Sequence, residues 1–172
     1  MRQVWITKAG PPDVLQVRDA PSPEPGPGEV RIAVEACGVN FADIVGRLGI
    51  NVDAPRIPFV PGYEVAGRIE AVGQGVDPAC LGTDVITLVS FGGYSEQVCV
   101  PLDQTFPRPA IMPVEQAAGF AVAALAAYAG LVVMAGVRPG DHVLIHAAAG
   151  GQGLAAVQIA RIVGATVYGT AS

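Results

Sequence analysis

The stretch GDHVLIHAAAGGQGLAAVQIAR, residues 140–161, predicts a buried strand, a glycine-rich turn and a helix, in that order. Residues 143–145 form a short apolar run behind a Pro-Gly-Asp turn signal, and apolar residues recur at helical spacing from Leu154 onward. Residues 165–170 then predict a second strand, so the whole stretch is one βαβ unit. Glycines at the first turn of such a unit let backbone N–H groups approach a pyrophosphate at the helix N-terminus.

The composition describes a chain that can bury a sizeable core. Of its 172 residues, 51% are hydrophobic and only 15% are charged. The net charge of −5 and the absence of a Lys/Arg cluster argue against nucleic acid or an anionic membrane as a partner. Cys37, Cys80 and Cys99 are widely spaced and odd in number, so they do not form a disulfide framework. With no apolar run of signal-peptide length at the N-terminus, we expect a cytoplasmic protein.

The segment 117–137 carries no charge and is long enough to cross a bilayer. It is rich in Ala and Gly rather than Leu and Ile, contains Tyr128, and lacks Lys/Arg flanks. We therefore expect one helix, or two short ones, that is hydrophobic on all sides because it is buried. A membrane span is the alternative interpretation.

Residues 1–106 alternate short strand-like runs with Pro/Gly turns. In the run 30–36, alternation predicts that Val30, Ile32, Val34 and Ala36 share one face. Further strands are predicted over 65–72, 84–89 and 95–100, and a short helix over 42–48. This pattern indicates a β-rich domain.

Five further motifs accompany the glycine turn: GPGEV (26–30), CGVNFAD (37–43), PFVPGYEVAG (58–67), GGYSEQVCV (92–100) and RPGD (138–141). From residue 4 to the end, the chain resembles the zinc-independent quinone oxidoreductases, relatives of ζ-crystallin in the medium-chain dehydrogenase/reductase superfamily. The resemblance implies an α/β fold with a β-rich part. A GroES-like catalytic domain would cover 1–106, connecting apolar helices 107–137, and the start of an NADPH-binding Rossmann domain 138–172.

Two strands are few for a parallel sheet, which normally has more strands and helices on both faces. We therefore expect the N-terminal portion of a longer enzyme. A shortened natural protein that a partner chain stabilises is the alternative.

The family's reaction is hydride transfer from a nicotinamide to a quinone or a conjugated enone. Negative charge develops on the carbonyl oxygen, so a nearby hydrogen-bond donor is stabilising. The resemblance implies Asn40 as this donor, with a helix cap as its alternative role, and favours a cap for Asp43. Tyr63 is a second catalytic candidate, as a phenol donor, with a packed aromatic as its alternative.

Zinc-dependent relatives place a cysteine and a histidine where this chain has Asn40 and Tyr63, which are not usual zinc ligands. We therefore predict no metal. Relatives often carry a tyrosine at the position of Asn51 and a threonine at that of Ala126, so two hydroxyl groups are missing near the expected nicotinamide site.

The expected cofactor is NADPH. An NAD-preferring site ends its second strand with an acidic residue, but here Thr170-Ala171-Ser172 stands there, and the Ser172 hydroxyl can bind a 2′-phosphate. The other cofactor-binding candidates are Asn40 and the residues of the turn, namely Ala149, Gly150, Gly151, Gln152 and Gly153.

The leading hypothesis is therefore an NADPH-dependent, zinc-independent quinone oxidoreductase, with a small quinone or enone as substrate and a homodimer in the full-length form. The HAAAGGQG turn (146–153) and the TAS ending (170–172) also resemble enoyl reductase domains of polyketide synthases. A catalytically inactive binding module is a third hypothesis. A membrane-associated protein is a fourth, because one branch of the family is named for synaptic vesicles.

Overall fold

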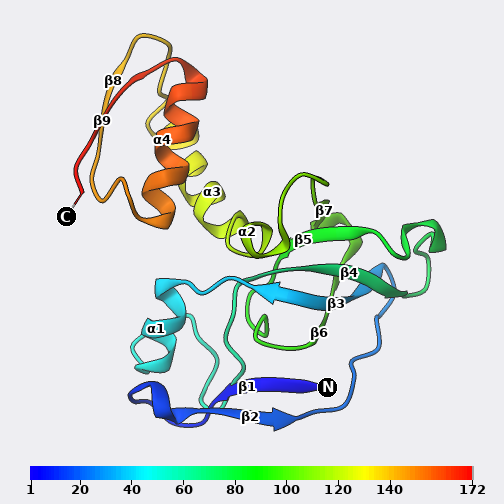
Figure 1. Ribbon diagram of the computed structural model, residues 1–172. Coiled ribbons are helices and arrows are strands. Elements are labelled where there is room, and N and C mark those ends of the chain that lie inside the picture. Colours follow the sequence, from blue (N-terminus) through cyan, green and yellow to red (C-terminus); the bar gives the residue numbers. More distant parts are fainter. Residues whose placement is uncertain (172) are drawn as a thin grey trace. The chain divides into compact units, whose positions relative to one another are not determined.

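A computed structural model describes residues 1–171 of the chain. The chain forms two compact units, Met1–Ala121 and the part from Val122 onward. The division falls within the apolar segment 117–137, close to the first residue of a helix (Figure 1).

The first unit is built on a five-stranded antiparallel sheet with the order β6-β3-β4-β5-β7. Its strands are β3 (Glu29–Cys37), β4 (Glu64–Val72), β5 (Asp84–Leu88), β6 (Gln97–Pro101) and β7 (Thr105–Pro107). The four strands predicted over 30–36, 65–72, 84–89 and 95–100 are confirmed as β3, β4, β5 and β6. The strand β7 was not predicted, since it contains only three residues and ends in proline.

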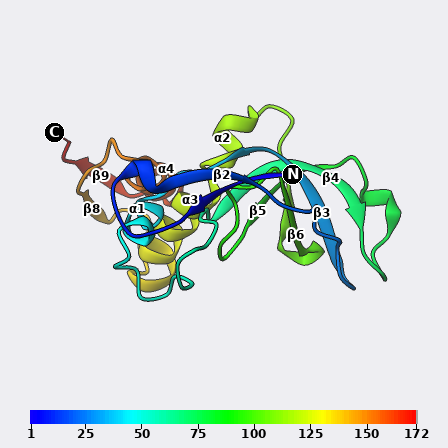
Figure 2. The ribbon, with the colours of Figure 1, turned by 90° about the horizontal axis from the view of Figure 1, so that it is seen from below.

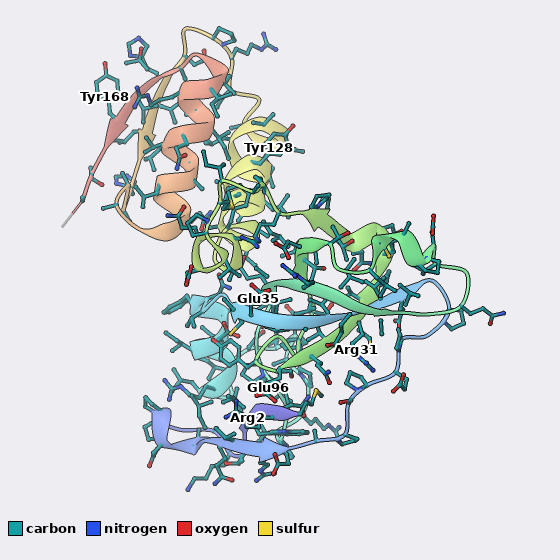
Figure 3. All side chains as sticks on the ribbon, turned by 45° about the vertical axis from the view of Figure 1, so that its right-hand side comes forward. Arg2, Arg31, Glu35, Glu96, Tyr128 and Tyr168 are labelled. Atoms are coloured by element: carbon teal, nitrogen blue, oxygen red, sulfur yellow. The ribbon has the colours of Figure 1, made fainter. Side chains whose placement is uncertain are left out.

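Two strands that the sequence did not reveal form a separate antiparallel ribbon, β1 (Arg2–Ile6) with β2 (Leu15–Asp19). This ribbon lies below the five-stranded sheet in Figure 1 and nearest the viewer in Figure 2. Single bridges join Gln3 to Ser95 and Ile6 to Phe59. Arg2 also pairs with Glu96, its Nε donating over 2.6 Å to a carboxylate oxygen (Figure 3). The ribbon is thus attached by partners more than 50 residues away.

The faces of β3 differ from the prediction at one residue. Val30, Ile32 and Val34 pack in one core cluster with Val65 and other residues of the sheet. Ala36 instead packs in a second cluster, which holds Ala66, Ile86 and the helix residues Ala117, Ala118 and Ala121. The prediction that Ala36 shares the face of the other three is wrong, because the register shifts between Val34 and Ala36. A bulge reverses the alternation after it.

Two helices complete the first unit. The helix α1 (Phe41–Arg47) confirms the helix predicted over 42–48, and α2 (Val114–Ala118) packs against β3 and β4. Short 3-10 turns cover Pro12–Val14, Pro78–Cys80 and Leu102–Gln104.

The second unit contains the predicted βαβ unit. It consists of β8 (His142–Ile145), α4 (Gly151–Val163) and β9 (Thr166–Gly169), with the two strands parallel. Ile145 and Ala156 pack with Ala127 of α3 (Ala121–Tyr128) in the core of this unit. The helix α4 begins three residues before Leu154, because its first turn carries no apolar side chain that periodicity could detect.

The segment 117–137 folds as the end of α2, then α3, then a π-helical turn over Ala129–Met134. Among residues 1–171, no helix is both long enough and apolar enough to span a membrane. The expectation that this segment is buried on all sides is wrong, since Phe120 and Leu125 are each 49% exposed. Val133 is 70% exposed and Met134 is 84% exposed, whereas Ala117 and Ala127 are buried.

Candidate functional site

The buried carboxylate of Asp43 organises the candidate site in the first unit. Asp43 is only 6% exposed and stands in the first turn of α1. One of its oxygens accepts the backbone N–H of Asn40 over 2.8 Å, and the other accepts that of Gly62 over 2.9 Å. The hydroxyl of Tyr94 also hydrogen-bonds to this carboxylate. We call these four residues the Asp43 cluster. It ties the start of α1 to the loops before β4 and before β6.

The electrostatics of the Asp43 cluster follow from its burial. Burial raises the pKa of the Asp43 carboxyl, while the N–H groups of Asn40 and Gly62 and the Tyr94 hydroxyl act in the opposite direction. Burial, followed by the negative charge of Asp43, raises the pKa of Tyr94 far above its ordinary value. The tyrosine therefore keeps its proton at neutral pH, and its hydroxyl donates a hydrogen bond to the carboxylate.

Asn40 is the N-cap residue of α1, and its side chain also reaches the start of β4. The amide Nδ2 donates to the Glu64 carboxylate over 2.9 Å. Glu64 is only 1% exposed, and a side chain at Gly38 would overlap its carboxylate, which explains the glycine there. An amide nitrogen has two N–H groups, so this bond leaves Asn40 a second one for a ligand.

Tyr63 lies between Gly62 of the Asp43 cluster and Glu64, the partner of Asn40. The two catalytic candidates are therefore linked through Glu64, which follows Tyr63 in the chain and accepts the hydrogen bond from Asn40. The phenol oxygen of Tyr63 accepts a hydrogen bond from Asn51 Nδ2 over 3.0 Å. Its ring contacts Phe91 with 5.2 Å between ring centroids. Burial and the charge of Asp43 raise the pKa of Tyr63, and the bond from Asn51 lowers it.

The glycine turn lies in the second unit and opens α4. Gly150 is the N-cap residue, and Ala149, Gly150, Gly151 and Gln152 are exposed. The first turn of α4 holds no acidic residue, and its leading N–H groups lack partners within the helix. A Cβ at Gly153 would overlap the carbonyl oxygen of Ala147, so only glycine fits there. Backbone donors and an exposed approach fit a pyrophosphate. Ser172 lies outside the described residues.

We also searched the described residues for a group of side chains that could bind a metal ion. Within the part of the chain that the structure describes, no three His, Cys, Asp or Glu side chains are grouped to hold a metal ion. His146 pairs through Nδ1 with the Thr170 hydroxyl at 3.0 Å, and His142 stacks on Tyr168. The second pair therefore joins β8 to β9, and the first joins the residues that directly follow these two strands.

Comparison with known proteins shows which family the chain belongs to. Residues 26–110 match the family described as the alcohol dehydrogenase GroES-like domain. The rat synaptic vesicle membrane protein VAT-1 homolog is 47% identical over 159 residues, which are 92% of this chain and 39% of that protein. Human quinone oxidoreductase is 39% identical over 173 residues, which are 99% of this chain and 53% of that protein. The chain belongs to the medium-chain dehydrogenase/reductase superfamily.

Solved structures of this superfamily match the chain along nearly its whole length. The Escherichia coli quinone oxidoreductase complexed with NADPH gives a TM-score of 0.90 at 33% identity, covering 99% of this chain and 52% of that one. The CurK enoyl reductase gives 0.92 at 36% identity, covering 99% and 54%. The predicted resemblance and fold class, a GroES-like part followed by the first βαβ unit of a Rossmann domain, are confirmed. The chain spans about half the length of these relatives, or less.

Sequence reasoning found Asn40, Asp43 and Tyr63 but missed the partners that hold them. Tyr94, Phe91 and the N–H group of Gly62 had no assigned role. One signal was available in the sequence, since Gly-Tyr pairs occur at 62–63 and 93–94. The structure brings these two pairs together, with the backbone N–H of Gly93 bonded to the carbonyl oxygen of Gly62 over 3.2 Å.

Proposed function

We propose that the chain carries the substrate site and the start of the cofactor site of an NADPH-dependent, zinc-independent oxidoreductase that reduces quinones or conjugated enones. The observation that carries the proposal is that the Asn40 amide donates to Glu64, the residue after Tyr63 in the chain, while Asn51 holds the Tyr63 phenol. Asn40 and Tyr63 stand at the positions where a zinc enzyme would have metal ligands. Both side chains are half-buried, so a ligand can reach them. The division into a catalytic domain over 1–106, a connection over 107–137 and a cofactor part over 138–172 belongs to this proposal.

In this proposal, the residues of the site have two kinds of role. Asn40 and Tyr63 donate hydrogen bonds to the carbonyl oxygen of the substrate or to the carboxamide of the cofactor, where negative charge must be stabilised. Asp43 keeps both in place through the backbone of Asn40 and of Gly62. Because the pKa of Tyr63 is raised, the phenol remains a donor over the whole neutral range.

The glycine turn would hold the cofactor, with backbone N–H groups from Ala149 to Gly153 toward the pyrophosphate and Ser172 toward the 2′-phosphate. Bound NADPH supplies the hydride. NADPH stands in the E. coli quinone oxidoreductase complex, a similar structure, which supports the choice of cofactor. We extend the proposal to a cytoplasmic protein whose full-length form is a homodimer.

A thermal melt with and without NADPH tests the proposal, with NADH as the control nucleotide. A cooperative transition that NADPH raises more than NADH supports it, because a ligand stabilises the folded state that binds it. A cooperative transition that neither nucleotide moves favours the binding-module hypothesis instead. Gly153→Val, which fills the space that the turn needs, should remove the NADPH effect.

Enoyl thioester reduction is the second candidate activity, and the similarity to the CurK enoyl reductase favours it. The discriminating measurement is the product formed from a quinone and from an enoyl thioester by a chain extended to the length of the relatives. Reduction of the thioester alone would contradict the quinone hypothesis.

A further inference from the structure

Asn51 and Tyr63 form a pair whose hydrogen-bond direction the structure fixes. The Asn51 Oδ1 accepts the backbone N–H of Asp53 over 3.1 Å. The other end of the amide, Nδ2, therefore faces the Tyr63 phenol oxygen at 3.0 Å. With the opposite amide orientation, two N–H groups would face each other at Asp53, so the network selects this one.

The direction of this bond decides what the phenol does. A phenol oxygen that accepts an N–H has its own proton free to donate elsewhere. The ring of Tyr63 has little freedom, since it packs on Phe91 and its backbone carbonyl accepts the N–H of Val89 over 2.9 Å. The O–H group is thus oriented before a ligand arrives, which lowers the entropy lost on binding.

The neighbours in the chain indicate the kind of ligand. Ile50 and Val52, on either side of Asn51, are 67% and 94% exposed. The charges that act on the Tyr63 phenol are those of Asp43 and Asp53, which are negative and disfavour an anionic ligand. A neutral donor among exposed apolar side chains suits a neutral carbonyl on an apolar ring, rather than a carboxylate or a phosphate.

We infer that Asn51 is a positioning residue that holds Tyr63 as the hydrogen-bond donor to the carbonyl oxygen of a conjugated cyclic ketone or quinone. This inference rests on the proposed function, since it names the substrate contact of the same site. Asn51 itself need not touch the substrate; it acts through the phenol.

The first test is ligand-free and measures the pair itself. Chains carrying [13Cζ]tyrosine are titrated by NMR, and Tyr63→Phe assigns the signal. Because the bond from Asn51 lowers the pKa of Tyr63, Asn51→Ala should raise that pKa. An unchanged titration in Asn51→Ala would overturn the inference, since the pair would then not exist in solution.

The second test uses 2-cyclohexen-1-one as the probe, with its carbonyl stretch followed by difference infrared spectroscopy. Binding to the wild type should lower the stretching frequency, and Tyr63→Phe should abolish that shift and weaken binding about three- to tenfold. Asn51→Asp is the sharpest variant. It keeps an oxygen for the Asp53 N–H but places a carboxylate beside the phenol, and this carboxylate accepts the hydrogen bond from the Tyr63 hydroxyl in place of the substrate. We expect it to mimic Tyr63→Phe.

A double-mutant cycle separates positioning from general structure. In the Tyr63→Phe background, Asn51→Asp should have no further effect on enone affinity; an equal effect in both backgrounds would overturn the inference. Tyr168→Phe, which removes an exposed phenol of the second unit, is the matched control and should change nothing. If the wild type does not bind the enone, the donor role is wrong, and the NADPH melt shows separately whether the proposed function fails with it.

Discussion

Removing one acceptor from the Asp43 cluster should measurably destabilise the first unit. The Asp43 carboxylate accepts two backbone N–H groups with its two oxygens, at 2.8 and 2.9 Å. In Asp43→Asn, the amide offers one oxygen and one NH2 group, so one of the two backbone donors loses its acceptor. An unsatisfied buried donor costs about 1–3 kcal/mol. Asp43→Ala removes both acceptors and should cost about 2–6 kcal/mol.

The assay is urea unfolding followed by the fluorescence of Trp5, the one tryptophan of the chain, which lies on β1 in the first unit. Amide hydrogen exchange at Asn40 and Gly62 gives a local readout of the same bonds. Asp103→Asn replaces an exposed carboxylate and should stay within about 0.5 kcal/mol of the wild type. The reasoning is refuted if Asp43→Asn is equally neutral and leaves exchange at both amides unchanged.

The pH dependence gives an independent check on Asp43. Its pKa is raised in the folded state above the ordinary value of 3.8, so the folded state binds the proton more tightly than the unfolded one. The stability that Asp43 contributes is therefore fully present below pH 3.8 and declines as the pH rises through the raised pKa. Asp43→Asn should remove this decline, and a wild-type profile that the substitution leaves unaltered would contradict the burial argument.

Substitutions at Gly153, Ala147 and Ile32, each with a comparison variant, test the turn and the core. Gly153→Ala should lower the melting temperature, because its Cβ overlaps the Ala147 carbonyl, whereas Gly151→Ala meets nothing within 4 Å and should be tolerated. Ala147 has a φ of 52°, so Ala147→Gly should change the free energy of unfolding by at most about 1 kcal/mol, while Ala147→Val should lower it by about 2 kcal/mol in urea unfolding. Ile32→Ala in the core should cost about 2–5 kcal/mol by the Trp5 assay, against less than about 0.5 for exposed Val39→Ala; equal losses would contradict the core assignment.

Elements set by local pattern could be predicted from the sequence. The βαβ unit, the strands β3 to β6 and the helix α1 each show an apolar periodicity or a turn signal within a few residues. The ribbon β1–β2 could not be predicted in this way, because Val17 is 66% exposed and its pairing depends on distant bridges. The face of Ala36 could not be predicted for a related reason, since the apolar pattern of residues 30–36 does not show where the register shifts.

The candidate site, like the fold, could be predicted from the sequence only in part. Asn40 and Tyr63 could be named from the sequence because motifs contain them, yet each had two possible roles. The contacts that separate these roles join residues far apart in the chain: Asp43 to Gly62, and Asn51 to Tyr63. No local periodicity encodes such contacts.

The sequence by itself therefore determined the superfamily, through the motifs that the family shares. It also determined the βαβ unit with its glycine turn, the strands β3 to β6 and the helix α1, because backbone preference and burial act over neighbouring residues. Only the tertiary structure decided which donors meet, which way the Asn51 amide points, and that a buried carboxylate holds the two loops of the site together. Those features depend on strand register and loop closure, which bring together side chains that the sequence keeps apart.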